Sequence, residues 1–308
     1  MIYIISHNRY KEFVKSGLYK YIPDFLLPKY WPRAIDNITK GEKIIGRVLG
    51  INLKPIDLSD VLCFDEYINS ILNLKSDDDN LMYIEGIEDV DINIIKEIES
   101  RTSMTIPTGE KNWLYNLPIL LKGLLQQLNE NSFGDEVLIV CGDKEKTMQL
   151  IRTLPEDLRF ISMIGNNEDV LEEIYETILD ETGISLFQPS NIEHTIKDYN
   201  VIINLSDEAI WDFKSIRRKA IIFDLSNTKS LSKIVEEYKN NIIINSISIS
   251  IKDTDILKNY WLGEQVSPRV YELLMADEFK KFYRIQWKSH NYTIEELINS
   301  EIKIKGNI

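Results

Sequence analysis

The sequence is poor in the side chains that most often carry covalent or metal chemistry. Its 308 residues include only two cysteines, Cys63 and Cys141, and three histidines. The cysteines do not form a zinc-ligand spacing or a disulfide framework. The histidines are scattered, and no Ser-His-Asp order, HExxH or CxxC motif accompanies them. We therefore expect no metal site, and we interpret both cysteines as packed residues of the core.

Positive charge and long apolar runs are also scarce. There are 36 lysines and arginines against 49 aspartates and glutamates, which gives a net charge of −13. Nucleic acids and anionic membrane surfaces both select a basic footprint, so we expect neither as a partner. No apolar run approaches the ~20 residues that span a bilayer, and the first residues are too few for a signal peptide. These features predict a cytoplasmic protein, and they leave a homo-oligomer open.

The second half of the chain alternates short apolar strands with helices. This pattern is typical of a parallel sheet covered on both faces, and right-handed crossovers then give a doubly wound Rossmann sheet. The expected helices cover residues 144–154, 170–182 and 231–238. The expected strands cover residues 137–140, 160–164, 184–187, 201–205, 220–225 and 242–249.

The first third mixes strand and helix patterns, and it predicts a smaller α/β lobe. A strong helix is expected over residues 113–128, and a final long helix over residues 266–287. We predict an α/β chain of two lobes. One is a substrate-type lobe of residues 1–111, to which residues 266–308 return, and the other is a Rossmann-type domain of residues 112–265.

The turn after the first Rossmann strand lacks most of the glycines of a phosphate-binding loop. Such glycines let backbone N–H groups approach a pyrophosphate at the start of a helix. Here the turn runs from Cys141 to Thr147, and only Gly142 remains, with Lys144 at the position of the second glycine. One interpretation is a plain turn that binds nothing. The other is that Gly142 and Lys144 still contact a cofactor, with Lys144 or Lys146 supplying compensating charge to the phosphates.

The turn after the second strand normally selects the ribose of the cofactor. Here it contains Asn166 and Asn167, followed by Glu168 and Asp169. The asparagines either hydrogen-bond a ribose or cap the following helix. No basic residue is in place for a 2′-phosphate. We therefore expect NADH rather than NADPH if either binds, and we expect that binding to be weak.

A second candidate site lies in the turn that leads into the long helix at residue 113. Thr108, Lys111 and Asn112 have the polar side chains of a substrate site, and we assign them as the candidate catalytic residues. Free N–H groups at the start of a helix favour a small carboxylate or phosphate. The alternative is that Thr108 merely caps this helix and Lys111 is solvated.

Several short stretches resemble the Rossmann oxidoreductases related to shikimate dehydrogenase, and more closely the long-chain acyl-carrier-protein reductases. The resemblance covers roughly residues 30–280 and depends on order and spacing. The stretches are Pro32–Asn37 followed by Gly41 and Gly46, Tyr83–Ile87, Pro107–Gly109, Val201–Ser206, Ile221–Ser226, and Gly263 with Val266–Met275. The resemblance implies an NAD(P)-dependent oxidoreductase of two lobes.

The departures from that pattern fall at the residues of the chemistry. Glu85 replaces the first glycine of a pair, and Arg269 lies near the position of the family's nucleophilic cysteine. Without a thiol, an acyl-thioester intermediate cannot form. Two hypotheses remain, and the sequence leaves open whether the protein is an enzyme. One is an oxidoreductase-like protein with impaired or lost cofactor binding. The other is a non-catalytic binding or regulatory module on a degenerate Rossmann fold.

Overall fold

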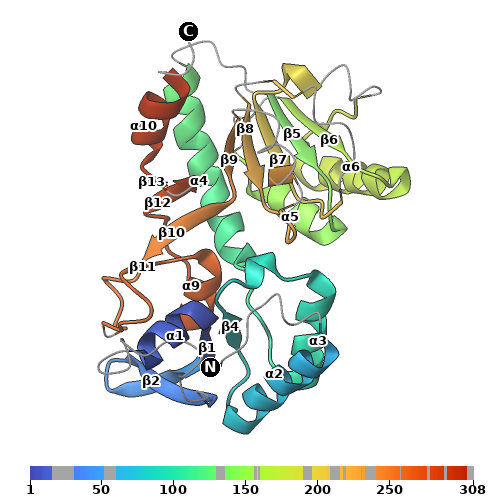
Figure 1. Cartoon of the computed structure of the whole chain (residues 1–308). Helices are drawn as coiled ribbons and strands as arrows, with labels where there is room; N and C mark the ends of the chain where they lie inside the picture. The colour runs from blue at the N-terminus through green and yellow to red at the C-terminus, as the bar shows by residue number, and fades with distance from the viewer. Residues whose placement is uncertain are drawn as a thin grey trace. The chain divides into compact units, whose positions relative to one another are not determined.

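The computed structural model confirms an α/β chain with a parallel five-stranded sheet and a separate mixed sheet (Figure 1). It describes residues 1–15, 31–51, 60–129, 136–155, 158, 160–189, 196–208, 216–217, 220–229, 231–232, 241–256, 258–275, 278–287 and 290–303. The chain forms two compact units. Unit 1 contains Met1–Gly109 and Ser250–Glu278, and unit 2 contains Glu110–Ile249 and Phe279–Ile308.

Unit 1 is built on a four-stranded sheet in the order β2-β3-β1-β4. β1, β3 and β4 run parallel, and β2 is antiparallel to β3. The strands are β1 (Ile2–Ile5), β2 (Arg33–Lys40), β3 (Lys43–Gly50) and β4 (Met82–Ile84), with the short strand β11 (Gln265–Val266) elsewhere in the unit. The helices are α1 (His7–Val14), α2 (Val61–Leu74), α3 (Ile92–Thr102) and α9 (Pro268–Met275), with the 3-10 turn η4 (Ile87–Asp89).

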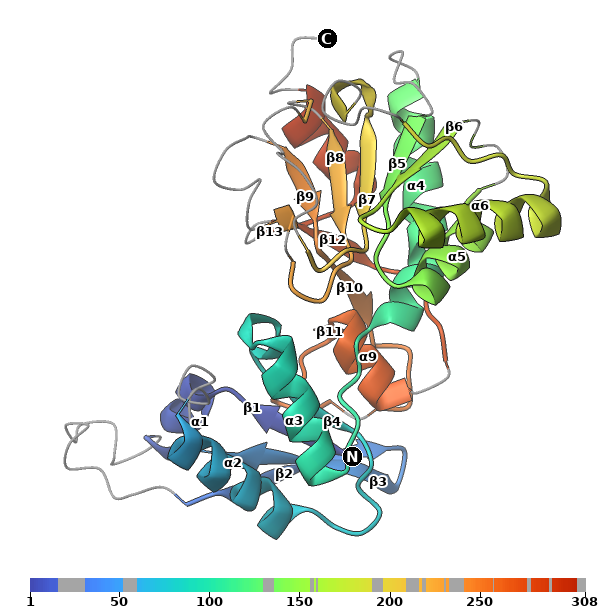
Figure 2. The same ribbon diagram turned by 90° about the vertical axis from the view of Figure 1, so that its right-hand side faces the viewer.

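Unit 2 is built on the five-stranded sheet, in the order β6-β5-β7-β8-β9 (Figure 2). Every neighbouring pair in this sheet is parallel. The strands are β5 (Glu136–Val140), β6 (Phe160–Ile164), β7 (Val201–Asn204), β8 (Ile221–Asp224) and β9 (Ile242–Ile244). The helices and turns along this stretch are α4 (Glu110–Asn129), α5 (Lys144–Thr153), α6 (Glu168–Thr182) and η5 (Ile196–Asp198).

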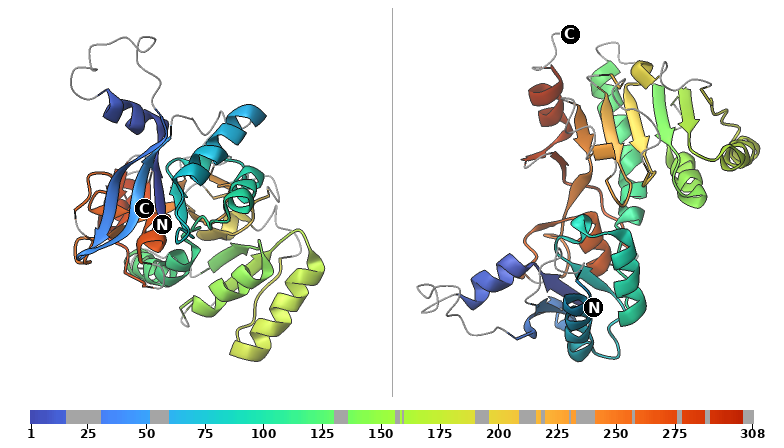
Figure 3. Two further views of the ribbon diagram at one scale, coloured as in Figure 1. Left: turned by 90° about the horizontal axis from the view of Figure 1, so that it is seen from below. Right: turned by 45° about the vertical axis from the view of Figure 1, so that its right-hand side comes forward.

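The apolar strands of unit 2 are buried because the sheet is covered on both faces. Successive side chains of a strand point to opposite faces. Val137 and Ile139 therefore join one apolar cluster, while Leu138 and Val140 join a second one. α5 and α6 pack side by side against the first face, which they share with α4 (Figure 3). This arrangement explains why the strands read as uninterrupted apolar runs.

The third strand expected from the sequence, residues 184–187, is reduced to a single bridge. Phe187 pairs with Ser162 in parallel, and its backbone exchanges hydrogen bonds with Ile161 and Met163 of β6. The sheet therefore follows the Rossmann order, with a rudimentary third strand outside the second. The strand order reverses between β5 and β7, which is the point where ligands of such sheets bind.

The prediction of one long helix over residues 266–287 is wrong beyond Met275. α9 ends there, and the chain continues into β12 (Arg284–Trp287), β13 (His290–Tyr292), α10 (Ile294–Leu297) and the π-helical turn η7 (Ile298–Lys303). In β12 the buried positions Ile285 and Trp287 alternate with the exposed Gln286. A period of two fits a strand and not a helix. β12 pairs antiparallel with β13 and with β10 (Ser246–Ser250).

The strand predicted over residues 242–249 is likewise two strands. β9 extends the parallel sheet beside β8, and β10 is antiparallel to β12. Asn245 separates them. The apolar pattern alone predicted strand conformation but did not show that the strand changes sheet partner.

Candidate functional site

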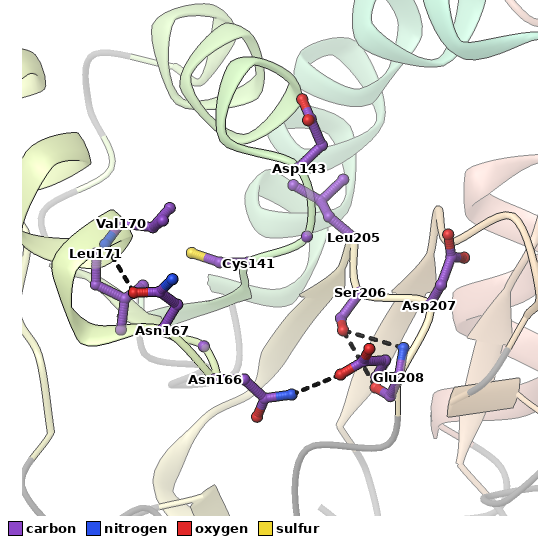
Figure 4. Close-up of a pocket in the computed structure, with 12 residues that line it drawn as sticks. Cys141, Asp143, Asn166, Asn167, Val170, Leu171, Leu205, Ser206, Asp207 and Glu208 are labelled. Carbon is purple, nitrogen blue, oxygen red and sulfur yellow. Dashed lines mark hydrogen bonds between the residues drawn. The ribbon is translucent and has the colours of Figure 1, made fainter.

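A pocket of about 390 Å³ lies at the carboxyl edge of the five-stranded sheet of unit 2 (Figure 4). Its lining comes from the loops that follow β5, β6 and β7, together with the start of α6. Parallel strands bring their carboxyl ends to one edge, and the reversal of strand order between β5 and β7 separates the loops there. The pocket therefore lies where a Rossmann sheet binds its ligand.

The loop after β5 comes very close to the loop after β7. A Cβ atom on Gly142 would lie 2.1 Å from the backbone oxygen of Leu205, so only glycine fits. The next residue, Asp143, precedes α5, and its carboxylate accepts a hydrogen bond of 3.0 Å from the backbone N–H of Lys146. The negative charge at the start of α5 is thus supplied by the protein's own side chain.

The two lysines of this loop are turned to other partners. Lys144 forms an ion pair with Glu173 of α6 and does not line the pocket. The amine of Lys146 donates to the backbone oxygen of Leu225 at 3.2 Å and pairs with Glu110 at 3.4 Å. Neither amine is among the groups that line the pocket.

The loop after β6 contributes both asparagines expected from the sequence. Asn167 directly precedes α6, and its side-chain oxygen accepts from the N–H of Val170 at 3.3 Å, so it caps the helix. The side chain of Asn166 instead donates to the carboxylate of Glu208 at 2.9 Å, across the pocket (Figure 4). Gly142, Asn166 and Asn167 therefore line one pocket, as a shared site requires, whereas Lys144 does not.

The loop after β7 contributes site residues that the sequence reasoning missed. Ser206, Asp207 and Glu208 all line the pocket. The signal was present in a repeated motif. Asn204-Leu205-Ser206-Asp207 ends β7, and Asp224-Leu225-Ser226-Asn227 ends β8, with acid and amide exchanged.

The register of the sheet pairs these two motifs side by side. Asn204 lies opposite Asp224 on the neighbouring strand, and its amide donates to that carboxylate at 3.0 Å. Asp224 is fully buried and also accepts from the hydroxyls of Ser226 and Ser232, at 2.6 and 2.7 Å. A buried carboxylate needs such donors to offset its lost hydration. We interpret Asp224 as the anchor of the loop that follows β8.

Asp207 fastens the ends of β7 and β8 to each other. Its carboxylate accepts from the backbone N–H groups of Asn227 and Thr228, at 2.6 and 3.0 Å, and from the side-chain amide of Asn227 at 3.1 Å. Burial raises the pKa of this carboxyl, but the hydrogen bonds from Thr228 and Asn227 outweigh burial and hold the pKa below its ordinary value. Asp207 is therefore a charged group at neutral pH.

Cys141 also lines the pocket, but its thiol is poorly suited to nucleophilic chemistry. Burial raises the pKa of the thiol to about 12, against a small opposing effect of a hydrogen bond with Thr147. The thiolate is the reactive form of cysteine, so this thiol is unreactive at neutral pH. It serves as an apolar part of the wall.

The three residues of the second candidate site differ in their exposure to solvent. Thr108 and Lys111 are exposed, whereas Asn112 is buried. α4 begins at Glu110, so Gly109 directly precedes the helix, and its N–H donates to the carboxylate of Glu272 at 2.8 Å. The negative group expected at this turn is thus the side-chain carboxylate of Glu272, a residue of α9. Neither amide atom of Asn112 has a hydrogen-bond partner within the described part of the chain.

Glu85 and Arg269, the two residues at which the sequence departs from the pattern it resembles, have partners within unit 1. Glu85 accepts from the hydroxyl of Tyr3 at 2.7 Å and from the N–H of Ser6 at 2.8 Å, and it pairs with Arg9. Arg269 lies 4.0 Å from Glu88. We interpret Glu85 as a structural anchor at the carboxyl edge of the unit 1 sheet.

The described residues contain neither a cluster of metal-binding side chains nor a helix that could span a membrane. Within the ranges given above, His, Cys, Asp and Glu side chains form no group of three or more that would hold a metal ion. None of the helices in those ranges combines the length and apolar character that crossing a membrane requires.

Comparison with known proteins gave matches to solved structures alone, because no family model and no curated protein matches the sequence. Quinate dehydrogenase from Corynebacterium glutamicum, solved with NAD, is 10% identical over 72% of this chain and 78% of its own, with a TM-score of 0.28. Shikimate dehydrogenase from Aquifex aeolicus is 11% identical over 79% and 86%, with a TM-score of 0.27. The nucleotide-binding domain of glutamyl-tRNA reductase from Thermoplasma volcanium is 15% identical over 39% and 97%, with a TM-score of 0.25.

Quinate and shikimate dehydrogenases, the group that the sequence resembles, are thus among these neighbours. At such low identities and TM-scores, the likeness assigns neither a family nor an activity to this chain. The assignment of a Rossmann-type sheet therefore rests on the order and direction of its own strands.

Proposed function

We propose that this chain is an oxidoreductase-like Rossmann protein that has lost productive dinucleotide binding and acts as a small-molecule binding module. The observation that carries the proposal is the carboxylate of Asp143 at the start of α5. In dinucleotide-binding sheets the pyrophosphate takes that position, where helix N–H groups and the helix dipole attract it. Here a fixed negative charge already uses one of those donors and would repel a phosphate.

The remainder of the pocket supports the same proposal. Asp207 and Glu208 add two more carboxylates to the lining, and the described part of that lining contains no lysine or arginine. The two lysines of the loop after β5, Lys144 and Lys146, form ion pairs with Glu173 and Glu110. A dinucleotide carries two negative charges on its pyrophosphate, so the residues present do not fit it.

A second candidate function is an NADH-dependent oxidoreductase acting on a small polar substrate. The position of the pocket, at the switch point of a Rossmann sheet, favours it. The two functions differ in their dependence on the cofactor, because hydride transfer requires a bound dinucleotide and a binding module does not.

Titration of the purified protein with NADH and with NADPH separates the two functions. We expect dissociation constants above about 100 μM by fluorescence and calorimetry, equivalent to about −5.5 kcal/mol or weaker. Tight binding of either cofactor at physiological salt would contradict the proposal.

Matched variants identify the cause of the weak binding. Asp143→Asn keeps the helix cap and removes one charge, so it should strengthen NADH binding. Glu145→Gln removes a charge from the same turn at a position outside the pocket lining, and it should change binding little. The steric alternative predicts instead that Lys144→Gly is the variant that restores binding. We do not expect this, because Lys144 points to Glu173.

A further inference from the structure

The pocket at the carboxyl edge of β5, β6 and β7 has the size of a site for one small molecule. Ligand sites usually enclose about 300–1,000 Å³, and this pocket, at about 390 Å³, is at the small end of that range. It suits a single ring system with a short substituent.

The lining divides into an apolar part and a charged part. Val170, Leu171 and Leu205 form an apolar wall together with the buried Cys141. Apolar lining of this kind holds a flat ring, and a few polar groups then fix its orientation.

The charged side chains in the described lining are all negative. Asp143, Asp207 and Glu208 line the pocket, and among the lining residues that the structure describes no side chain is positively charged. The charge of Lys146 acts on Asp207 from outside this lining. Asp207 is held ionised by the loop after β8, since its hydrogen bonds keep the carboxylate form. Glu208 accepts a hydrogen bond from the neutral amide of Asn166, which is a weaker donor than a protonated amine.

From the size of this cavity and the sign of its charge, we infer that it binds a phosphate-free ring compound of nucleoside size that carries a protonated amine. This inference rests on the proposed function, because it names the ligand class of the same pocket. The ring lies against the apolar wall, and the amine replaces Asn166 as the donor to Glu208. The ligand charge is thus opposite to that of a dinucleotide.

Three probes of one shape and different charge test the inference. Adenosine is neutral, adenosine 5′-monophosphate is anionic, and 5′-amino-5′-deoxyadenosine is cationic. We expect the amine to bind at least about tenfold more tightly than the monophosphate by calorimetry, with adenosine between them. The preference should shrink at high salt, because screening weakens charge–charge interactions.

Variants of the pocket test which carboxylate provides the selectivity. Glu208→Gln keeps the size and the hydrogen-bonding capacity but removes the charge, so it should reduce the preference for the amine several-fold. Glu145→Gln, outside the pocket lining, should leave the preference unchanged. Thermal unfolding of each variant checks that it folds, and Asp143→Asn provides a second charge removal if Glu208→Gln does not fold.

Binding of the monophosphate equal to or tighter than that of the amine would overturn the inference, and so would the absence of binding by all three probes. Neither result would affect the proposed loss of dinucleotide binding, which only tight binding of NADH or NADPH contradicts.

Discussion

Single residues at the carboxyl edge of the unit 2 sheet explain why its loop departs from a dinucleotide loop. Gly142 is retained because the loops after β5 and β7 touch, and the position next to it is an acid that caps α5. Asp207 joins the loop after β7 to the loop after β8. The residues that depart from the expected pattern are therefore parts of a well-bonded structure.

Gly142→Ala is expected to destabilise the protein. The new Cβ atom would lie 2.1 Å from the backbone oxygen of Leu205, so one of the two loops must move. Overpacking of this kind costs about 1–3 kcal/mol. Urea unfolding of the variant measures the loss. Lys144→Ala, two residues further on in an exposed ion pair, should change stability by about 0.5 kcal/mol or less, and an equal loss in both variants would contradict the explanation.

The contribution of Asp207 to stability is expected to depend on pH. Its folded-state pKa lies below the ordinary value, so its stabilising effect is present above the unfolded pKa of about 4 and is lost as the pH falls through the folded pKa. The free-energy difference between the wild type and Asp207→Asn should therefore be largest near neutral pH and shrink below about pH 4. Denaturant unfolding from pH 7 to pH 3 measures it. Glu172→Gln, on the exposed face of α6, provides the control. A difference that stays constant over this range would refute the role of the charge.

Within a single element, α4, two buried asparagines, Asn112 and Asn116, differ in their hydrogen bonding. Asn116 is fully buried and makes three hydrogen bonds. Its amide donates to the backbone oxygens of Asn112 and Lys280, and its oxygen accepts from the N–H of Phe282 at 2.7 Å. It thereby fixes the chain that leads into β12. Asn112, one turn earlier, is equally buried, but its amide atoms have no partner among the described residues.

The two asparagines are therefore expected to respond in opposite ways to the same substitution. Asn116→Leu removes the partners of Lys280 and Phe282, and it should cost about 2 kcal/mol or more. Asn112→Leu replaces a desolvated amide by an apolar group of similar size, and it should be neutral or stabilising. Chemical denaturation of both variants measures the contrast. A large loss in the free energy of unfolding for Asn112→Leu would instead mean that this amide has a hydrogen-bond partner and, with it, a functional role.

At the scale of the whole chain, each compact unit is assembled from two separate segments. Unit 2 takes its last segment from Phe279–Ile308, whose buried residues join the same apolar cluster as α4 and α5. A strand near the end of the sequence thus completes a core that begins at residue 110. The chain leaves unit 2 after Ile249, contributes Ser250–Glu278 to unit 1, and then returns.

This arrangement predicts that the returning segment is essential to unit 2. Ile285 is fully buried in the apolar cluster, whereas Phe279 is half exposed and stacks on Tyr115. Ile285→Ala should cost about 2–5 kcal/mol because it leaves a cavity. Phe279→Ala should cost clearly less, since the side chain is already half in water. Thermal and urea unfolding compare them, and similar losses would argue against a shared core.

The local sequence was sufficient to predict the types of the strands β5 to β8 and of the helices α5 and α6. Uninterrupted apolar strands alternate with amphipathic helices in this part of the chain, and only a parallel sheet covered on both faces buries them. Of the four residues predicted to bind a cofactor, Gly142, Asn166 and Asn167 line one pocket and Lys144 does not, because the first three follow strands whose carboxyl ends meet at one edge of the sheet. Of the two roles that the sequence left open for Asn167, the structure shows helix capping, and an asparagine before an acidic first turn is a helix start signal.

Tertiary structure alone decided the rest, because those features depend on which strands become neighbours. Glu208 lies beside Asn166, 42 residues away, only because β7 and β6 flank β5. Asp207 meets Asn227 because β7 and β8 pair in register. The direction of Lys144 toward Glu173 depends on the packing of α5 against α6. The division of residues 242–250 and 266–287 between different elements depends on long-range pairing with β8 and β10, which a local period cannot encode.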